Sequence, residues 1–156
     1  MKKSFLAVCF GLATLVFSVS GLKAQTTPVS PEVPAAADPW KASEQLDPAT
    51  LAGLLKAGNA PLIFNIGAVE DIKTAKHVGP VGEAKFLAKF KNMIAALPKN
   101  TQVVIYCGCC ALPKCPNVRP AYQELKAAGF TNIRVLNIAV NLKTNWIAAG
   151  FPLSDK

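Results

Sequence analysis

The sequence predicts a three-layer α/β fold, in which a central parallel sheet is covered by helices on both faces. Short runs of consecutive apolar residues, without alternating polar positions, are typical of strands that are buried on both faces. Segments with the apolar spacing of a helix lie between these runs, and this alternation indicates parallel strands joined by helices. The predicted strands are 61–66, 102–106 and 133–136.

The segments between the strands carry helix start and stop signals. Asp47 is expected to cap a first helix, with Pro48 in its first turn and Gly58 at its end. Further helices are predicted at 83–97, 118–128 and 142–149. Asn117 is expected to cap the second of these three. Residues 67–82 are predicted to be irregular because glycine and proline interrupt them.

Residues 1–24 read as a secretory signal peptide. They combine a basic start, a short apolar stretch and the small residue Ala24 at the expected cleavage site. The apolar stretch is shorter than the roughly 20 residues that a membrane span needs. We therefore expect an exported protein, periplasmic or secreted, without a stable membrane anchor after cleavage. An uncleaved anchor is the weaker alternative.

The next segment, residues 25–43, is rich in proline, alanine, serine and threonine. Such a composition buries too little apolar surface to fold alone, so this segment is predicted to be a linker. Trp40 is expected to pin the end of the linker to the domain. Residues 44–156 are then predicted to form one domain.

The charge of the chain is moderate and spread out. Cleavage would remove Lys2, Lys3 and Lys23 and no acidic residue, so the formal charge would fall from +8 to +5. The chain has no basic run interleaved with aromatic residues, so the sequence does not support nucleic-acid binding. Scattered lysines indicate solubility or a weak attraction for anions.

The most informative feature is a loop that contains four of the five cysteines. Cys107, Cys109, Cys110 and Cys115 lie in residues 107–115, directly after a predicted strand, and Cys9 falls in the predicted signal peptide. Ligands of parallel α/β sheets bind beyond the carboxyl ends of the strands. Buried cysteines that only fill a core are not expected to cluster in this way. The loop therefore indicates sulfur, redox or soft-metal chemistry.

The order of a strand, Cys107, a loop and Arg119 at the start of a helix resembles the active site of the rhodanese family of sulfurtransferases. Other segments resemble the family's opening helix, first central strand, cysteine-bearing strand and closing segments, in the same order: 46–51, 62–65, 104–107, 125–130 and 146–152. His77 lies where the family usually has a Gly-His-Ile-Pro-Gly turn. The resemblance extends over nearly the whole predicted domain and implies a rhodanese-like three-layer fold.

The resemblance also implies roles for individual residues. Cys107 would accept a sulfane sulfur as a persulfide, with its thiolate exposed at the electropositive start of the helix near Val118. Arg119, together with Lys114, would stabilise that thiolate or an anionic donor. An ordinary surface salt bridge is the alternative for Arg119, and a turn residue that satisfies backbone groups is the alternative for His77.

Three features depart from the family pattern, and one of them is that a Gly-Gly pair, usual after the last strand, is missing near residues 138–139. Eleven residues separate Cys107 from Arg119, more than in the family, and this insert carries the three additional cysteines. The family's Asp-x-Arg sequence after the first strand is replaced by residues 65–67, Asn-Ile-Gly.

The additional thiols, Cys109, Cys110 and Cys115, admit three interpretations. One of them can act as a resolving thiol that attacks a persulfide or mixed disulfide on Cys107. They can form structural disulfides, with Cys109 or Cys110 paired to Cys115 or Cys107. They can also bind a soft metal, copper(I) or zinc, although the paired Cys-x2-Cys spacing of structural zinc sites is missing.

The main hypothesis is an exported rhodanese-like protein that handles sulfane sulfur through Cys107 and Arg119. The protein would act as a thiosulfate-type sulfurtransferase or catalyse a related thiol–disulfide step. Its partners would be a small sulfur donor and a thiol acceptor, and a redox protein is a further candidate partner. This activity requires no cofactor and no metal. The alternative is a non-catalytic scaffold whose four-cysteine loop binds copper or zinc, or contacts a redox partner.

Overall fold

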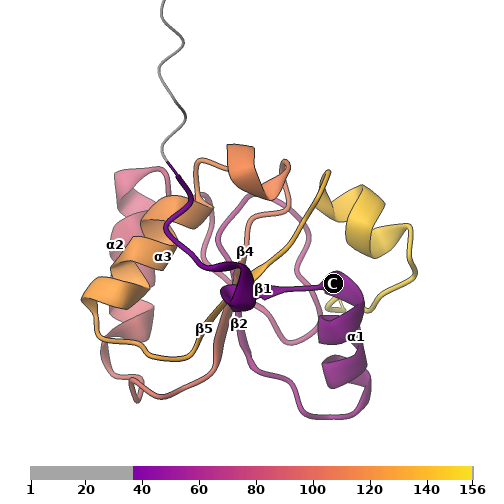
Figure 1. The fold of residues 1–156 in the computed structure, drawn as a ribbon, viewed down its shortest axis with the longest axis horizontal. Coiled ribbons are helices and arrows are strands. Elements are labelled where there is room, and N and C mark those ends of the chain that lie inside the picture. The colour runs from indigo at the N-terminus through magenta and orange to yellow at the C-terminus, as the bar shows by residue number, and fades with distance from the viewer. Residues whose placement is uncertain (1–36, 156) are drawn as a thin grey trace, which may run out of the picture. The chain divides into compact units, whose positions relative to one another are not determined.

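The computed structural model describes residues 37–155, which contain a five-stranded sheet with the strand order β1-β5-β4-β2-β3 (Figure 1). All neighbouring strands in this sheet are parallel. The strands are β1 (Gln45–Leu46), β2 (Leu62–Asn65), β3 (Lys76–His77), β4 (Val103–Tyr106) and β5 (Ile133–Leu136). Within the described residues, no helix combines the length and the apolar character that a membrane crossing requires.

Helices cover both faces of this sheet. Figure 1 shows α2 (Ala84–Ala95) and α3 (Val118–Ala127) on one side and α1 (Pro48–Lys56) with the five-residue π-helical segment η3 (Lys143–Ile147) on the other. Each side has its own buried apolar cluster. The predicted three-layer α/β fold with a central parallel sheet is therefore confirmed.

The central strand β4 explains why the sequence shows continuous apolar runs. Successive side chains of a strand point to opposite faces. Val103 and Ile105 join the cluster beneath α2 and α3, whereas Val104 and Tyr106 join the cluster beneath α1 and η3. All four residues are buried because both faces are covered. No position of β4 remains where a polar side chain would reach water.

The predicted helix start at Asp47 is confirmed. Its Oδ1 accepts hydrogen bonds from the backbone N–H groups of Ala49 and Thr50, at 2.8 and 3.2 Å. These groups have no partner within the helix, so the carboxylate stabilises the first turn of α1. Gly58 ends the segment with a φ of +77°, a conformation that glycine adopts without strain.

Two short strands were not predicted from the sequence. β3 lies within residues 67–82, which were expected to be irregular, and β1 precedes the first helix. Each has two residues, and both sit at the edges of the sheet, where β1 pairs with β5 and β3 pairs with β2. Two residues are too few to show the side-chain alternation of a strand. The position of such a strand depends on the neighbouring strand with which it pairs.

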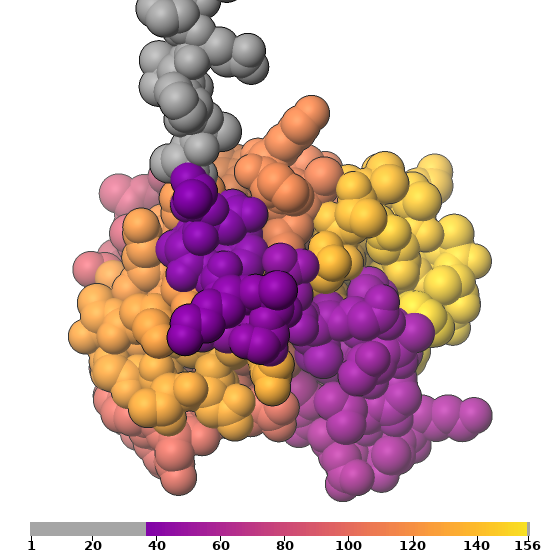
Figure 2. Space-filling model, in the orientation of Figure 1, coloured from indigo at the N-terminus to yellow at the C-terminus, as the bar shows by residue number. Residues whose placement is uncertain are grey.

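The folded unit begins earlier than the predicted boundary at residue 44. Trp40 is 6 % exposed, and its ring packs edge-on against Tyr122 of α3, with 5.9 Å between the centroids. Asp38 forms an ion pair with Arg119 at 3.0 Å. Figure 2 shows the segment after residue 37 lying against the surface to which α3 contributes. Trp40 therefore pins this segment to the domain, as expected, whereas residues 41–43 are exposed.

The remaining N-terminal predictions concern residues outside this range. The predicted signal peptide, 1–24, and residues 25–36 of the predicted linker lie outside the described residues.

Candidate functional site

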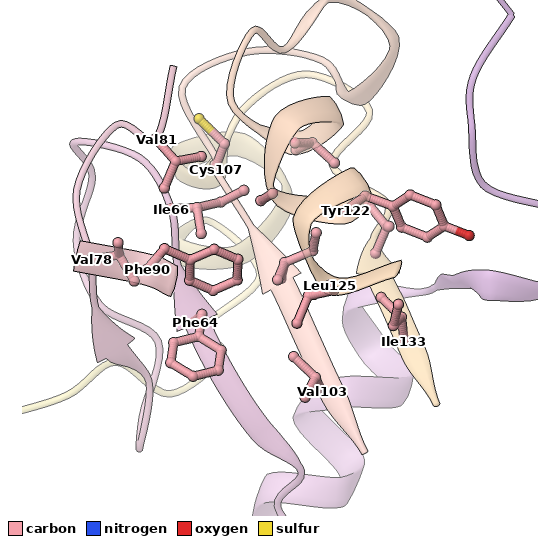
Figure 3. Close-up of a cluster of buried hydrophobic side chains, with 14 of the residues drawn as sticks. Phe64, Ile66, Val78, Val81, Phe90, Val103, Cys107, Tyr122, Leu125 and Ile133 are labelled. Atoms are coloured by element: carbon pink, nitrogen blue, oxygen red, sulfur yellow. The ribbon is translucent and has the colours of Figure 1, made fainter. Parts of the chain in front are cut away.

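Cys107 directly follows β4, at the carboxyl end of the sheet's central strand. The chain then continues through the short helix η2 (Leu112–Lys114) to α3. Figure 3 shows the Cys107 sulfur beyond the end of the strand, pointing away from the buried side chains of Phe64 and Leu125. The fold therefore places this thiol at the edge where parallel α/β sheets bind their ligands.

Three of the four sulfur atoms come together. The Sγ atoms of Cys107, Cys109 and Cys115, which we call the sulfur cluster, all lie within 4.8 Å of one another. The two Sγ atoms of Cys107 and Cys109 are 3.0 Å apart. Cys110 lies beside the cluster, with its Sγ 3.4 Å from that of Cys109. All four are free thiols, so the structure contains none of the disulfide pairings considered from the sequence.

The sulfur cluster extends from the interior to the surface. Cys107 is 2 % exposed and Cys115 is 7 % exposed, whereas Cys109 is exposed to solvent. The prediction of an exposed Cys107 is therefore wrong. Leu112 of η2 and Val118 of α3 belong to the same buried cluster as Cys107, because the enlarged loop packs back over the end of β4.

Asn117 supplies a polar contact to the buried sulfur. It is 6 % exposed, and its Nδ2 donates a hydrogen bond to Cys107 Sγ at 3.1 Å. Its Oδ1 accepts a hydrogen bond from the N–H of Gly82 at 2.8 Å. The predicted side-chain cap of α3 by Asn117 is not formed, although the residue stands at the cap position. The amide is used instead to join residue 82 to the cysteine loop.

The hydrogen bonds around Cys107 favour its anion. Donation from the Cys115 thiol, followed by donation from the Cys109 thiol, Asn117 and the Cys109 backbone, lowers the pKa of Cys107 to about 5 even though burial opposes ionisation. Burial raises the pKa of Cys109 to about 12, and its hydrogen bond to Cys107 acts in the same direction. The pKa of Cys115 is also raised, chiefly because its thiol donates to Cys107. These hydrogen bonds therefore favour a negative charge on Cys107, with the two neighbouring thiols as its donors.

The start of α3 acts on a different cysteine from the predicted one. The backbone N–H groups of Asn117 and Val118 donate to Cys115, which lowers its pKa against the larger opposing effects. The sulfur of Cys107 instead accepts a hydrogen bond from the backbone N–H of Cys109. The electropositive end of α3 thus reaches Cys107 through the Cys115 thiol, which then donates onward.

The segment after β2 packs tightly against Cys107. A Cβ atom on Gly67 would lie 2.4 Å from the carbonyl oxygen of Cys107 and 2.8 Å from its Sγ, so only glycine fits here. Asn65 is fully buried, and its Oδ1 accepts a hydrogen bond from the N–H of Gly67 at 3.0 Å. Asn65 Nδ2 donates to Val69 O and to Asp71 Oδ1, both at 2.8 Å. Asn65 therefore fixes the loop that holds Gly67 beside the sulfur.

Sequence reasoning missed these roles of Asn65, Gly67 and Asn117. Residues 65–67 were noted because they depart from the pattern of the resembled family, which was the available signal. Their function as packing partners of Cys107 depends on contacts between β2 and β4, and the sequence does not display those contacts.

Arg119 is held by residues of the N-terminal segment. Its guanidinium donates to Ala37 O at 2.8 Å and to Asp38 Oδ1 at 3.0 Å. It also lies over the ring of Trp40, 5.7 Å from the centroid. These contacts match the salt-bridge alternative considered above. The polar side chain that the structure brings to Cys107 is Asn117, two residues earlier in the chain.

His77 belongs to a separate polar group at the end of β3. Its Nδ1 lies 2.9 Å from Asp71 Oδ1 and 3.3 Å from Asn65 Nδ2. The side chain is 48 % exposed. Its contacts therefore support the loop after β2, in agreement with the interpretation of His77 as a residue of a turn.

The sulfur cluster contains the residues that could hold a soft metal ion, namely Cys107, Cys109 and Cys115. Thiolates suit copper(I) and zinc. With zinc–sulfur bonds of about 2.3 Å, two thiolates on one tetrahedral ion are about 3.8 Å apart. Cys107 and Cys109 are closer than this, at 3.0 Å, so one of these two sulfur atoms would have to move for both to bind one ion.

Comparisons of this chain with protein-family models, with curated proteins and with solved structures found no match.

Proposed function

We propose that this protein handles sulfane sulfur, carried as a persulfide on Cys107, in the manner of a rhodanese-like sulfurtransferase. The observation that carries the proposal is the position of the Cys107 sulfur. It lies at the end of the central strand of a parallel sheet, within hydrogen-bond distance of Asn117 Nδ2 and 3.0 Å from a second thiol. The resemblance of the surrounding segments to the rhodanese family supports the same activity.

The chemistry requires a thiolate and a means of stabilising it. The Cys107 thiolate attacks the outer sulfur of a donor R–S–SH, a new S–S bond forms, and the donor's S–S bond breaks to release R–S⁻. The products are Cys107–S–SH and, after a proton transfer, R–SH with the Cys107 persulfide anion. The hydrogen-bond donors that stabilise the Cys107 thiolate also stabilise the persulfide anion, because both anions carry one negative charge on sulfur. The low pKa of Cys107 is consistent with this role.

The partners implied by this chemistry are a sulfur donor and a thiol acceptor. The acceptor thiolate attacks the outer sulfur of Cys107–S–SH, which returns Cys107 to the thiolate form. Neither half-reaction needs a cofactor, since Cys107 is oxidised to the persulfide as the donor is reduced to R–SH, and the acceptor thiol reverses that change.

A second candidate function is soft-metal binding by the sulfur cluster. The convergence of three Sγ atoms within 4.8 Å favours it. The ion would take three thiolates, and the protein would then be a binding module and not an enzyme. The short Cys107–Cys109 separation makes us place this candidate second.

The test is sulfur loading of the full chain. Reduced protein is incubated with thiosulfate or with glutathione persulfide, alkylated, digested and mapped by mass spectrometry. We expect one added sulfur atom on Cys107 in the wild-type protein and in Cys110→Ser, and its disappearance on addition of dithiothreitol. We expect Cys107→Ser to lose the transfer of sulfur from thiosulfate to the acceptor thiol.

Metal analysis of protein purified under reducing conditions separates the two candidates. Metal-free protein that loads Cys107 supports sulfur transfer. Near-stoichiometric copper or zinc, released by thiol alkylation, together with no loading by either donor, would favour the binding module and overturn the proposal.

A further inference from the structure

We propose that Cys109 is the residue at which external persulfides deliver and collect sulfur, and that it relays the sulfur atom to Cys107. This inference rests on the proposed function. The substrate class is a persulfide of an ordinary thiol, R–S–SH, for which the exposed Cys109 is the more accessible sulfur.

The exposure of the two residues requires an intermediary. Cys107 is 2 % exposed, whereas its neighbour Cys109 is exposed. A thiol-borne persulfide must bring its outer sulfur into line with the attacking sulfur, and a buried residue offers a bulky donor little room for this approach. Cys109 offers the donor an open sulfur in direct contact with the buried one, 3.0 Å from it.

The loop backbone holds the two sulfurs in this relation. Gly108 adopts a φ of +72°, and a Cβ atom at this position would lie 2.8 Å from Cβ of Leu142. The carbonyl of Gly108 accepts a hydrogen bond from the N–H of Leu142 at 2.8 Å. The turn between Cys107 and Cys109 is thus fixed against the loop before η3, and this keeps the two cysteines close to one another.

In the delivery step, Cys109 first gives its proton to the adjacent Cys107 thiolate, because only a thiolate is nucleophilic enough to attack a persulfide. The Cys109 thiolate attacks the outer sulfur of R–S–SH, forming Cys109–S–SH and breaking the donor's S–S bond. The proton then passes from Cys107 to the leaving R–S⁻, which departs as R–SH and leaves Cys107 as the thiolate.

The relay step then moves the sulfur inward. The Cys107 thiolate attacks the outer sulfur of Cys109–S–SH, forming a Cys107 S–S bond and breaking the Cys109 S–S bond. The persulfide proton moves to the Cys109 thiolate that leaves. The products are the Cys107 persulfide anion and the Cys109 thiol, and the same two steps in reverse carry sulfur to an acceptor.

The hydrogen bonds around Cys107 favour movement of the sulfur atom from Cys109 to Cys107. The hydrogen bonds that stabilise a charge on Cys107 leave Cys109 protonated when the site is at rest. A sulfur atom that carries the persulfide charge is therefore more stable on Cys107 than on Cys109. Cys110 lies outside the sulfur cluster, 3.4 Å from Cys109, so it is a matched neighbouring thiol for the test.

The experiment is rapid-quench loading of the full chain with glutathione persulfide, followed by alkylation and mass mapping of residues 107–115. In the wild-type protein we expect the added sulfur on Cys109 first and on Cys107 later. In Cys109→Ser we expect the rate of Cys107 loading to fall by about 100-fold, because the reaction loses its positioned partner. In Cys107→Ser, which lacks the thiolate that takes the Cys109 proton, Cys109 should load more slowly and the sulfur should remain there. Cys110→Ser should load as the wild-type protein does.

The outcomes are distinguishable. If Cys109→Ser loads Cys107 at the wild-type rate, the relay is wrong and the proposed function stands. If Cys110→Ser is the variant that loses loading, sulfur arrives at Cys110 and the relay through Cys109 is also wrong. If Cys107 is not loaded in the wild-type protein by either glutathione persulfide or thiosulfate, the proposed function itself fails.

Discussion

Asn117, directly before α3, and Arg119, in its first turn, serve two regions of the molecule that differ in burial and in contacts. Asn117 points inward, is buried, and contacts a sulfur atom through a hydrogen bond. Arg119 points to the surface segment around Asp38 and is about one-third exposed. A polar contact acts on a neighbouring charge most strongly where water is excluded. The inner contact should therefore control the chemistry of the site, and the outer one should contribute a modest amount to stability.

The largest expected effect concerns the inner region and its dependence on pH. Because the pKa of Cys107 is lowered to about 5, its proton should be absent where an ordinary thiol is still protonated. The near-ultraviolet thiolate absorbance of the reduced protein should therefore persist from about pH 8 to pH 6 and disappear as the pH falls through about 5. Cys107→Ser should lack this signal. A midpoint near that of an ordinary thiol would contradict the account of the sulfur cluster.

The second-largest effect is expected for the substitution of Asn117. A hydrogen bond to a charged group contributes about 1.5–3 kcal/mol, so Asn117→Ala should raise the pKa of Cys107 and slow its loading with sulfur. The comparison variant is Asn59→Ala, since Asn59 is exposed and follows α1. An unchanged thiolate titration in Asn117→Ala would show that the two thiol donors suffice without the amide.

Gly67→Ala tests the packing against Cys107. The added Cβ would lie 2.4 Å from the Cys107 carbonyl oxygen, so the loop or the cysteine must shift. Overpacking of this kind costs about 1–3 kcal/mol of unfolding free energy, measured by denaturant titration. Gly53→Ala is the matched control, because no atom lies within 4 Å of a Cβ there. In that helix position alanine should stabilise the protein by about 0.5–1 kcal/mol. Equal stability of Gly67→Ala and the wild-type protein would argue against the tight contact.

The smallest effect is expected for the outer region. Arg119→Gln and Asp38→Asn break the same ion pair, so each should lower the unfolding free energy by about 0–1 kcal/mol and leave the loading of Cys107 unchanged. A selective loss of thiosulfate loading in Arg119→Gln, but not in Asp38→Asn, would instead support the anion-binding role that the family resemblance implies for Arg119.

The candidate site was predictable in part. The four thiols are adjacent in sequence, and the apolar run before them indicates a buried parallel strand, so their location at the carboxyl edge of the sheet follows from local pattern. The position of Asn117 at the start of a helix was also predictable. Its contact with Cys107 was not, because a side chain that caps a helix and one that turns toward a sulfur occupy the same position in the sequence.

By itself, the sequence determined the three-layer fold, the order of the long elements and the concentration of sulfur in one loop. These features depend on the spacing of apolar residues and on turn residues, which act over a few neighbours. Only the tertiary structure decided which cysteine is buried, which is exposed, and which polar group meets the sulfur. Those properties depend on how η2, α3 and the loop after β2 close over the end of β4, and contacts between distant segments leave no periodic signal in the chain.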